Sequence, residues 1–275
     1  MKKRLVLNKI MFALVVILSI ATIIPLFLIF VYILKEGISI INWNFFTKLP
    51  KPVGESGGGV FNAIIGTLII SFLSSFMAIP IGIGAGVYLY EQQDSKFVNI
   101  IKICIDILQG VPSIMLGIIA YIWIVKPMGC FSAISGSVAL AVMMLPVIVC
   151  NTEESLRMVP YSIKEVAFAL GVPYYRVILR IIIPSALSGI ITGILIGLNR
   201  IIGETAPLLF TAFGSPYLNL NPFKPMASLP LMIFNYAVSP YIGWIKQAWG
   251  ASLVLCIIIF LITLVSKIGI QCGKK

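Results

Sequence analysis

The side chains best suited to chemistry stand in a short polar run within a long apolar stretch. Arg200 and Glu204 are four positions apart, and Asn199 and Thr205 stand beside them. On one continuous helix this spacing places Arg200 and Glu204 on the same face, where they can pair. The guanidinium group is a planar fork of donors that binds two oxygens of an oxyanion at once. These four side chains therefore predict a site on the path of an anion. The alternative is an ion pair that only fixes helix packing.

The composition shows what surrounds this polar run. Hydrophobic residues make up 60% of the 275 residues and charged residues 11%, whereas soluble proteins have about 25% charged residues. The composition therefore predicts that the chain lies in a lipid bilayer. A charged side chain inside a bilayer is costly and faces the bundle interior or a wet cavity. We expect the same of Arg200 and Glu204.

The residue inventory excludes several classes of function. There is no histidine, which removes imidazole metal sites and Ser-His-Asp triads. The five cysteines are scattered without a C-x-x-C pair, as is typical of small buried side chains rather than disulfides. The net charge of +11 comes from basic residues beside apolar runs, which is a membrane pattern. No catalytic residue, metal, cofactor or nucleic-acid partner is predicted, and the chain is not expected to be an enzyme.

Six apolar stretches are long enough to cross a bilayer, since a span needs about 20 residues. The fold class predicted is therefore an all-α integral membrane protein with six transmembrane helices. We expect residues 1–34 to form a retained N-terminal transmembrane helix, because the apolar run is too long for a signal peptide. Residues 57–270 are expected to form a core domain of five helices. Pro80 and Pro112 should kink the second and third spans. The six stretches are residues 10–34, 61–90, 100–125, 132–150, 185–211 and 249–268.

The distribution of Lys and Arg predicts the orientation of these spans. With a cytoplasmic N-terminus, most of the basic residues fall in segments on the cytoplasmic side, as the positive-inside rule requires. Both termini and the loop 151–185 are then cytoplasmic. The loops 35–60 and 212–248 lie outside, where they are either a docking face for an external partner or plain connectors.

The cytoplasmic stretch 161–184 has its own helix signals. Ser162 and Glu165 have the spacing of a capping box, which predicts a helix start. Gly171 fits the position after the helix, where a positive φ is needed. Pro173 fits the first turn of a second helix. The stretch is therefore predicted to be a short helix, an elbow and another helix, a rigid element that another protein could grip.

The same stretch is similar to the EAA loop of ABC-importer permeases, whose pattern is E-A-A-x₃-G-x₉-I-x-L-P. Val166 and Ile183 depart from it conservatively. The resemblance implies the type I permease fold and a coupling helix that docks on a separate ATPase subunit. That implication fits the absence of a Walker A loop from this chain. The implied coupling residues are Glu165, Ala167, Gly171, Ile181 and Pro184.

Further motifs resemble the PstA-type permease family of high-affinity phosphate importers. They include the runs 110–113 (GVPS) and 203–207 (GETAP). The resemblance implies a multi-pass subunit of the bacterial cytoplasmic membrane that transports phosphate. It also implies a homologous second permease, an ATPase dimer and an extracytoplasmic phosphate-binding protein as partners.

Three alternatives stay open at this point. The first is an ABC permease for another oxyanion, such as sulfate or molybdate, because the EAA loop does not discriminate between substrates. The second is a secondary anion transporter or channel, which would need ion-coupling carboxylates and no docking loop. The third is a membrane enzyme, which the lack of histidine and of a carboxylate cluster disfavours.

Overall fold

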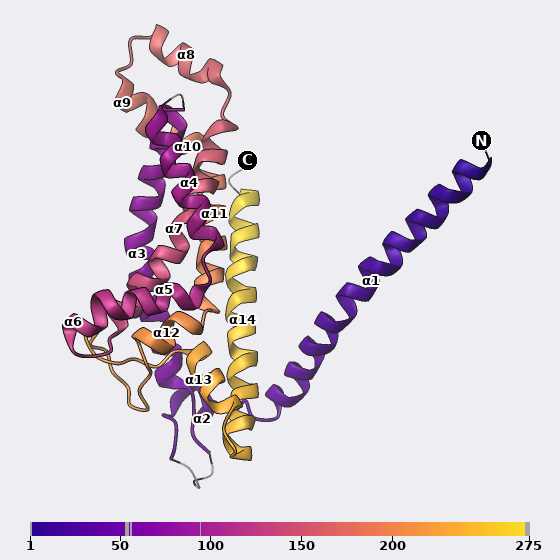
Figure 1. The fold of residues 1–275 in the computed structure, drawn as a ribbon, viewed down its shortest axis with the longest axis vertical. Coiled ribbons are helices and arrows are strands. Elements are labelled where there is room, and N and C mark those ends of the chain that lie inside the picture. The colour runs from indigo at the N-terminus through magenta and orange to yellow at the C-terminus, as the bar shows by residue number, and fades with distance from the viewer. Residues whose placement is uncertain (1, 53–54, 56, 94, 273–275) are drawn as a thin grey trace.

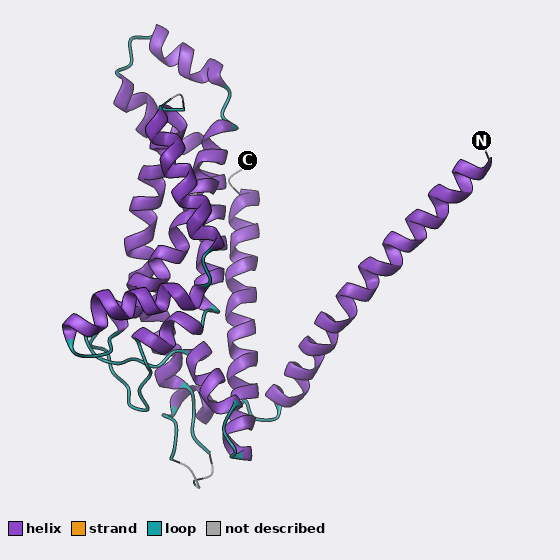
Figure 2. Ribbon diagram, in the orientation of Figure 1, coloured by secondary structure: helices purple, strands orange, loops and turns teal. Residues whose placement is uncertain are grey.

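The computed structural model describes residues 2–52, 55, 57–93 and 95–272. These residues form helices joined by short loops and no strand, as Figure 2 shows. Two helices contain a π-helical turn, at Tyr121–Val125 and Ile178–Ile182. The α-helices are α1 (Lys2–Ile38), α2 (Trp43–Thr47), α3 (Phe61–Glu91), α4 (Lys96–Gly110), α5 (Ser113–Ala120), α6 (Lys126–Met128), α7 (Ala133–Arg157), α8 (Tyr161–Ala169), α9 (Tyr174–Val177), α10 (Ile183–Ser185), α11 (Leu187–Ile202), α12 (Ala206–Thr211), α13 (Leu229–Ala237) and α14 (Ile242–Cys272).

Within these residues, four helices are long and apolar enough to cross a membrane by themselves: α1, α3, α7 and α14. Two more candidate spans are bent pairs. The α4 helix meets the α5–α6 segment at 103°, and the α9–α10 segment meets α11 at 67°. Counting each bent pair as one span confirms the predicted all-α membrane fold with six spans. The N-terminal end of α1 and the C-terminal end of α14 lie towards the same end of the molecule as α8 (Figure 1). The predicted orientation requires this arrangement, because it places both termini and the loop 151–185 on one side of the membrane.

The centre of the bundle is α7, which packs between α3 and α11. Contact is close because glycines face it from both neighbours. A Cβ atom on Gly82 or Gly86 of α3 would lie 2.7 or 2.6 Å from side-chain atoms of α7. On α11, a Cβ on Gly197 would lie 2.9 Å from Met144. The α3 glycines therefore form a helix-packing face, as expected of small residues in membrane helices. Gly84 is the exception, since nothing lies near it.

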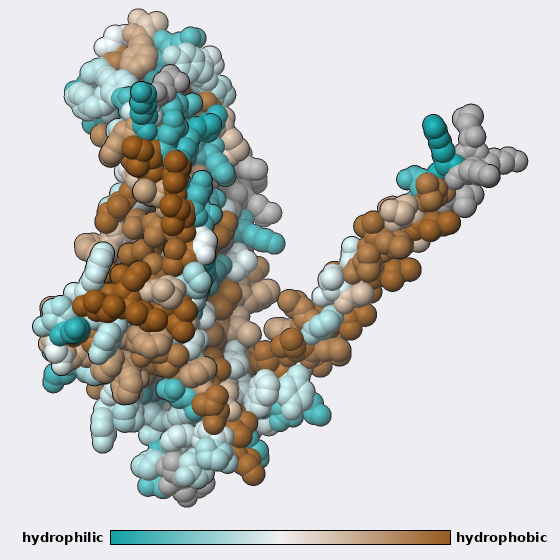
Figure 3. Space-filling model, viewed as in Figure 1, coloured by the Kyte–Doolittle hydropathy of each residue, from teal (hydrophilic) through white to brown (hydrophobic). Residues whose placement is uncertain are grey.

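Many large hydrophobic side chains are exposed on the outside of the bundle and along α1. Figure 3 shows hydrophobic side chains along both, with hydrophilic ones gathered towards the ends. The α1 helix leaves the bundle (Figure 1) and contacts α14 near its own C-terminal end, where Tyr32 packs edge-on to Trp249 at 5.0 Å. Exposed apolar helices of this length belong in lipid or against another membrane subunit.

Two of the predicted spans are interrupted near a proline rather than merely kinked. Pro112 separates α4 from α5, whereas α3 continues through Pro80 without interruption. The predicted fifth span, 185–211, is wrong as one helix, because α11 ends at Ile202 and α12 starts at Ala206. Pro207 explains the break: it has no N–H to donate, and its ring clashes with the carbonyl of the preceding turn.

Candidate functional site

The first candidate region is the elbow segment, residues 161–177, which projects beyond the bundle (Figure 1). Its helix α8 begins at Tyr161, one residue before Ser162, and no side chain caps it. The predicted capping box between Ser162 and Glu165 is therefore wrong. Pro160 stands at the N-cap position instead, with a φ of −59° and a ψ of 131°. The carbonyl of Pro160 accepts from the Ile163 N–H at 3.1 Å and closes the first turn.

The end of α8 is built as predicted. Gly171 has a φ of +71°, which an L-residue adopts only at a cost. Its N–H donates to the Phe168 carbonyl at 2.9 Å, and the Val172 N–H donates to the Ala167 carbonyl at 3.2 Å. This pair of bonds is the Schellman motif. The second helix starts at Tyr174, so Pro173 is its N-cap residue rather than its first helical residue.

The implied coupling residues lie within the elbow segment or shortly after it, and they divide into a buried group and an exposed group. Ala167 is buried and packs in a hydrophobic cluster with Leu156, Val177 and Ile182, against which Ile181 also packs. Glu165, Gly171 and Pro184 are exposed. The structure thus brings Ala167 and Ile181 together beneath the elbow and leaves the other three on the surface, where a partner could reach them.

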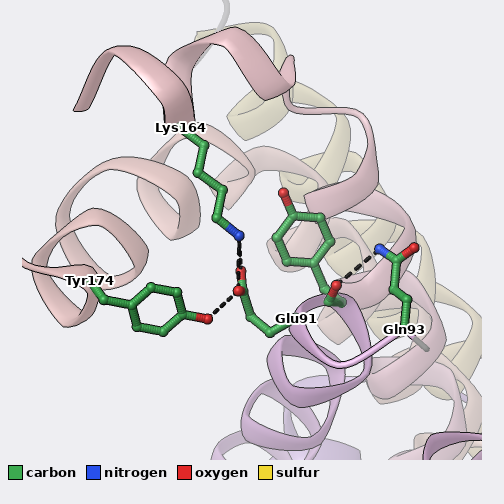
Figure 4. Close-up of polar contacts among 5 residues, drawn as sticks. Glu91, Gln93, Lys164 and Tyr174 are labelled. Atoms are coloured by element: carbon green, nitrogen blue, oxygen red, sulfur yellow. Dashed lines mark hydrogen bonds and ion pairs between the residues drawn. The ribbon is translucent and has the colours of Figure 1, made fainter. Parts of the chain in front are cut away.

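A buried ion pair that the sequence reasoning missed ties the elbow segment to α3 (Figure 4). Lys164 Nζ lies 3.0 Å from Glu91 Oε1 and 2.9 Å from Glu91 Oε2. The Tyr174 hydroxyl donates to the same carboxylate. The two charged side chains are only 13% and 10% exposed. Lys164 also lies over the rings of Tyr90 and Tyr174, at 5.5 and 5.7 Å, where cation–π attraction adds to the pair.

The second candidate region is the end of α11 and the break that follows it. Arg200 is exposed in the last turn of α11, and Glu204 is half-buried in the break. No ion pair joins them among the described residues, so the pairing that their spacing would allow does not form. The helix ends at Ile202, so the four-residue spacing no longer places Arg200 and Glu204 on one face. The guanidinium group of Arg200 is consequently available to an anion.

The flanking polar residues have different surroundings. Asn199 Nδ2 donates to Thr263 Oγ1 of α14 at 3.0 Å, while its Oδ1 atom is buried without a hydrogen-bond partner among the described residues. Thr205 is the N-cap residue of α12 but makes no side-chain capping bond. The α12 helix packs closely on α5, because a Cβ on Gly117 would lie 2.6 Å from Pro207 Cα. The polar run therefore does not lie on one helix face. Asn199 on α11 contacts α14, and Thr205 begins α12, which packs on α5.

A cavity of about 600 Å³ opens at the end of the bundle away from the elbow segment. It lies between the starts of α3 and α14 and the helix α13. Its lining includes Asn62, Trp244 and Tyr236, and burial raises the pKa of the Tyr236 phenol. Of the described residues in the lining, Lys51 is the one cation, and it already pairs with Glu55 at 3.2 Å. The described lining of this cavity therefore offers no unpaired cation to an anion. No cluster of metal-binding side chains occurs in the part of the chain that the structure describes.

Comparison with known proteins identifies the family. Residues 78–271 match the family model of binding-protein-dependent transport system inner membrane components. The chain belongs to this family. One relative in it is the phosphate transport system permease protein PstA of Xylella fastidiosa, 42% identical over 84% of this chain and 81% of its own length. Another is the probable PstA of Methanocaldococcus jannaschii, 39% identical over 93% of this chain and 90% of its own length.

A solved structure shares the fold of this family member. It is a chain of the MetNI methionine ABC transporter in an inward-facing conformation, with a TM-score of 0.66 and 20% identity. The match covers 78% of this chain and 95% of that one. At this identity the match shows the fold alone, which is that of an ABC-importer permease.

Proposed function

We propose that this chain is a transmembrane permease subunit of an ATP-driven importer of inorganic phosphate in the bacterial cytoplasmic membrane. The observation that carries the proposal is the similarity to phosphate permeases along most of the chain. In this proposal a homologous second permease completes the path, and an extracytoplasmic phosphate-binding protein delivers the anion. A separate ATPase dimer supplies the energy. The proposed division of the chain is an N-terminal transmembrane segment over residues 1–34, which α1 extends to Ile38, and a core permease domain over residues 57–270 with its cytoplasmic coupling loop 151–185.

The elbow segment is the proposed contact with the ATPase. Its outward side carries exposed apolar side chains, with Val166 59% and Leu170 78% exposed. Such a short apolar ridge fits a groove on a partner. Its inward side is fixed by Ala167, Ile181 and the Schellman turn at Gly171. We therefore assign Glu165 and Pro184 to the contact region and Ala167, Gly171 and Ile181 to holding its shape.

The end of α11 is the proposed phosphate path. Arg200 binds phosphate oxygens transiently with its fork of donors. Asn199 and Thr205 contribute neutral polar groups next to it. Glu204 lowers the positive potential along the path, because a like charge repels the anion and favours its release. Weak binding of this kind suits a path, since the anion must both enter and leave.

The test is uptake of labelled phosphate by proteoliposomes that contain the complete complex. Arg200→Gln removes the charged fork while keeping a polar side chain, and we expect uptake to fall by about 10- to 100-fold, since a hydrogen bond to a charged group contributes about 1.5–3 kcal/mol. Arg4→Gln is the matched control, because Arg4 is also an exposed arginine but lies at the start of α1, outside both candidate regions. Equal uptake by Arg200→Gln and wild type would remove Arg200 from the path.

The same preparation separates the alternatives. Excess unlabelled sulfate should leave the uptake of labelled phosphate unchanged, whereas a permease for another oxyanion would show the reverse preference. Uptake should also stop when the ATPase subunit is omitted. Uptake that continues without the ATPase would instead indicate a secondary transporter.

A further inference from the structure

We propose that Glu91 is a positioning residue that couples the elbow segment to the membrane spans through α3. The inference rests on the proposed function, in which the elbow segment receives movement from an ATPase. Glu91 is the last residue of α3, and its carboxylate holds both arms of the elbow at once. Lys164 belongs to α8, before Gly171, and Tyr174 belongs to α9, after it.

The geometry of this clamp favours transmission of force. Lys164 contacts both oxygens of Glu91 within 3.0 Å, so the pair resists displacement in more than one direction. Both side chains are largely shielded from solvent, at 13% and 10% exposed, so the attraction between them is screened less than on an open surface. The ring of Tyr174 stacks on Phe168 at 6.2 Å, nearly parallel, which brings α9 against α8. The Glu91 carboxylate therefore holds α8 and α9 in a fixed position relative to the end of α3.

Little else of a polar nature connects α8 to the spans. Within the described residues, Lys164 provides the side-chain hydrogen bonds of α8, and both end on Glu91. The other contacts are the hydrophobic packing beneath Ala167 and the Tyr90 ring of α3, over which Lys164 lies. Hydrophobic packing is non-directional, whereas the Glu91 carboxylate is met by both the Lys164 ammonium and the Tyr174 hydroxyl, so it fixes two side chains of the elbow at once. The clamp thus defines where α8 sits on the bundle.

The clamp continues into a tightly packed set of helices. The α3 helix contacts α7 through Gly82 and Gly86, and α7 contacts α11 through Gly193 and Gly197. Close-packed helices move as units rather than deforming continuously. A displacement of Glu91 is therefore passed through α7 to the end of α11, where Arg200 lies. The glycine contacts give this path a physical basis, and a coupling measurement is what tests it.

The experiment measures two rates in the reconstituted complex: ATP hydrolysed and phosphate taken up. Glu91→Gln keeps the size of the side chain but removes its charge. We expect uptake per ATP hydrolysed to fall by about tenfold or more, in the usual range of coupling between sites. Glu55→Gln is the matched control, because it neutralises the exposed partner of Lys51 far from the elbow, and its ratio should equal that of wild type. An unchanged ratio in Glu91→Gln overturns the inference.

A double-mutant cycle distinguishes a clamp from a general loss of stability. Lys164→Met and the double variant Glu91→Gln/Lys164→Met are measured in the same way. If the pair acts as one clamp, the double variant loses no more coupling than either single variant. Losses that multiply in the double variant contradict the inference.

Exchange of the two charges is the final test. It can still be measured if the single variants fail to assemble, because it restores an ion pair at the same place. Glu91→Lys/Lys164→Glu restores an ion pair between α3 and α8, so uptake per ATP should return towards the wild-type value. If this exchanged pair assembles and hydrolyses ATP without uptake, the inference is overturned. The wild-type complex separates the two proposals: no ATP-dependent phosphate uptake at all refutes the proposed function, whereas normal wild-type uptake with an unchanged Glu91→Gln ratio refutes only the clamp.

Discussion

Gly171→Ala isolates the backbone geometry of the elbow from every other contact. A Cβ atom at this position would meet no heavy atom within 4 Å among the described residues, so the substitution causes no clash there. Its cost comes from the φ of +71°, because an L-residue in the left-handed region loses about 1–2 kcal/mol. Part of this loss is offset by about 0.4–1 kcal/mol, since alanine also reduces the freedom of the unfolded chain. The net cost is therefore about 1 kcal/mol.

This cost falls on the elbow rather than on the whole fold. The Schellman bonds of Phe168 and Ala167 depend on the φ of Gly171, so the turn can relax while the bundle keeps its packing. A difference of about 1 kcal/mol lowers the equilibrium constant for the native elbow roughly fivefold. We expect the complex to assemble with wild-type yield and its uptake of phosphate per ATP to fall by up to that factor, since the native elbow is lost at most in proportion to its equilibrium constant.

The assay is the ratio of phosphate uptake to ATP hydrolysis in proteoliposomes. Gly129→Ala is a close control, because Gly129 has a φ of +69° and a Cβ atom there would likewise meet no described heavy atom within 4 Å. It follows α6, far from the elbow, so it carries the same backbone cost without the coupling role. Gly171→Asn should lie between wild type and alanine, since Asn tolerates the left-handed region. Equal ratios for Gly171→Ala and Gly129→Ala would refute the reasoning.

Two further substitutions test packing and the proposed path. Gly66→Ala should lower the free energy of unfolding by about 1–3 kcal/mol, because its Cβ would clash with the Ala227 carbonyl oxygen, and backbone cannot move aside cheaply. Gly84→Ala, which meets open space in the same helix, should lose nothing in the same thermal denaturation in detergent. Asn199→Leu removes one hydrogen bond but also an unpaired buried oxygen, so stability should change by less than about 1 kcal/mol. Phosphate uptake by this variant should still fall if Asn199 lines the path, and unchanged uptake would exclude it.

Local signals predicted the elbow well in one place and poorly in another. Gly171 was predicted correctly because a positive φ after a helix depends on neighbouring residues alone. The capping box failed because Ser162 and Pro160 were competing starts two residues apart. The ring of Pro160 fixes its φ, so the helix begins directly after it without a side-chain capping bond.

The sequence by itself determined the features that depend on composition and short-range order. The bilayer as solvent, the apolar spans, their orientation and the elbow around Gly171 all follow from residues close to one another in the chain. Apolar run length and the Lys and Arg distribution act locally, so no tertiary information was needed.

Only the tertiary structure decided which distant residues meet. Glu91 and Lys164 are 73 positions apart, and no periodicity relates them. The ion pair forms because α3 ends where the elbow folds back onto the bundle. Conversely, the four-residue spacing of Arg200 and Glu204 would allow them to pair on one continuous helix, but the helix breaks before Pro207 and the pair does not form. In both cases helix ends and packing set the partners, and these depend on the whole bundle rather than on spacing along one segment.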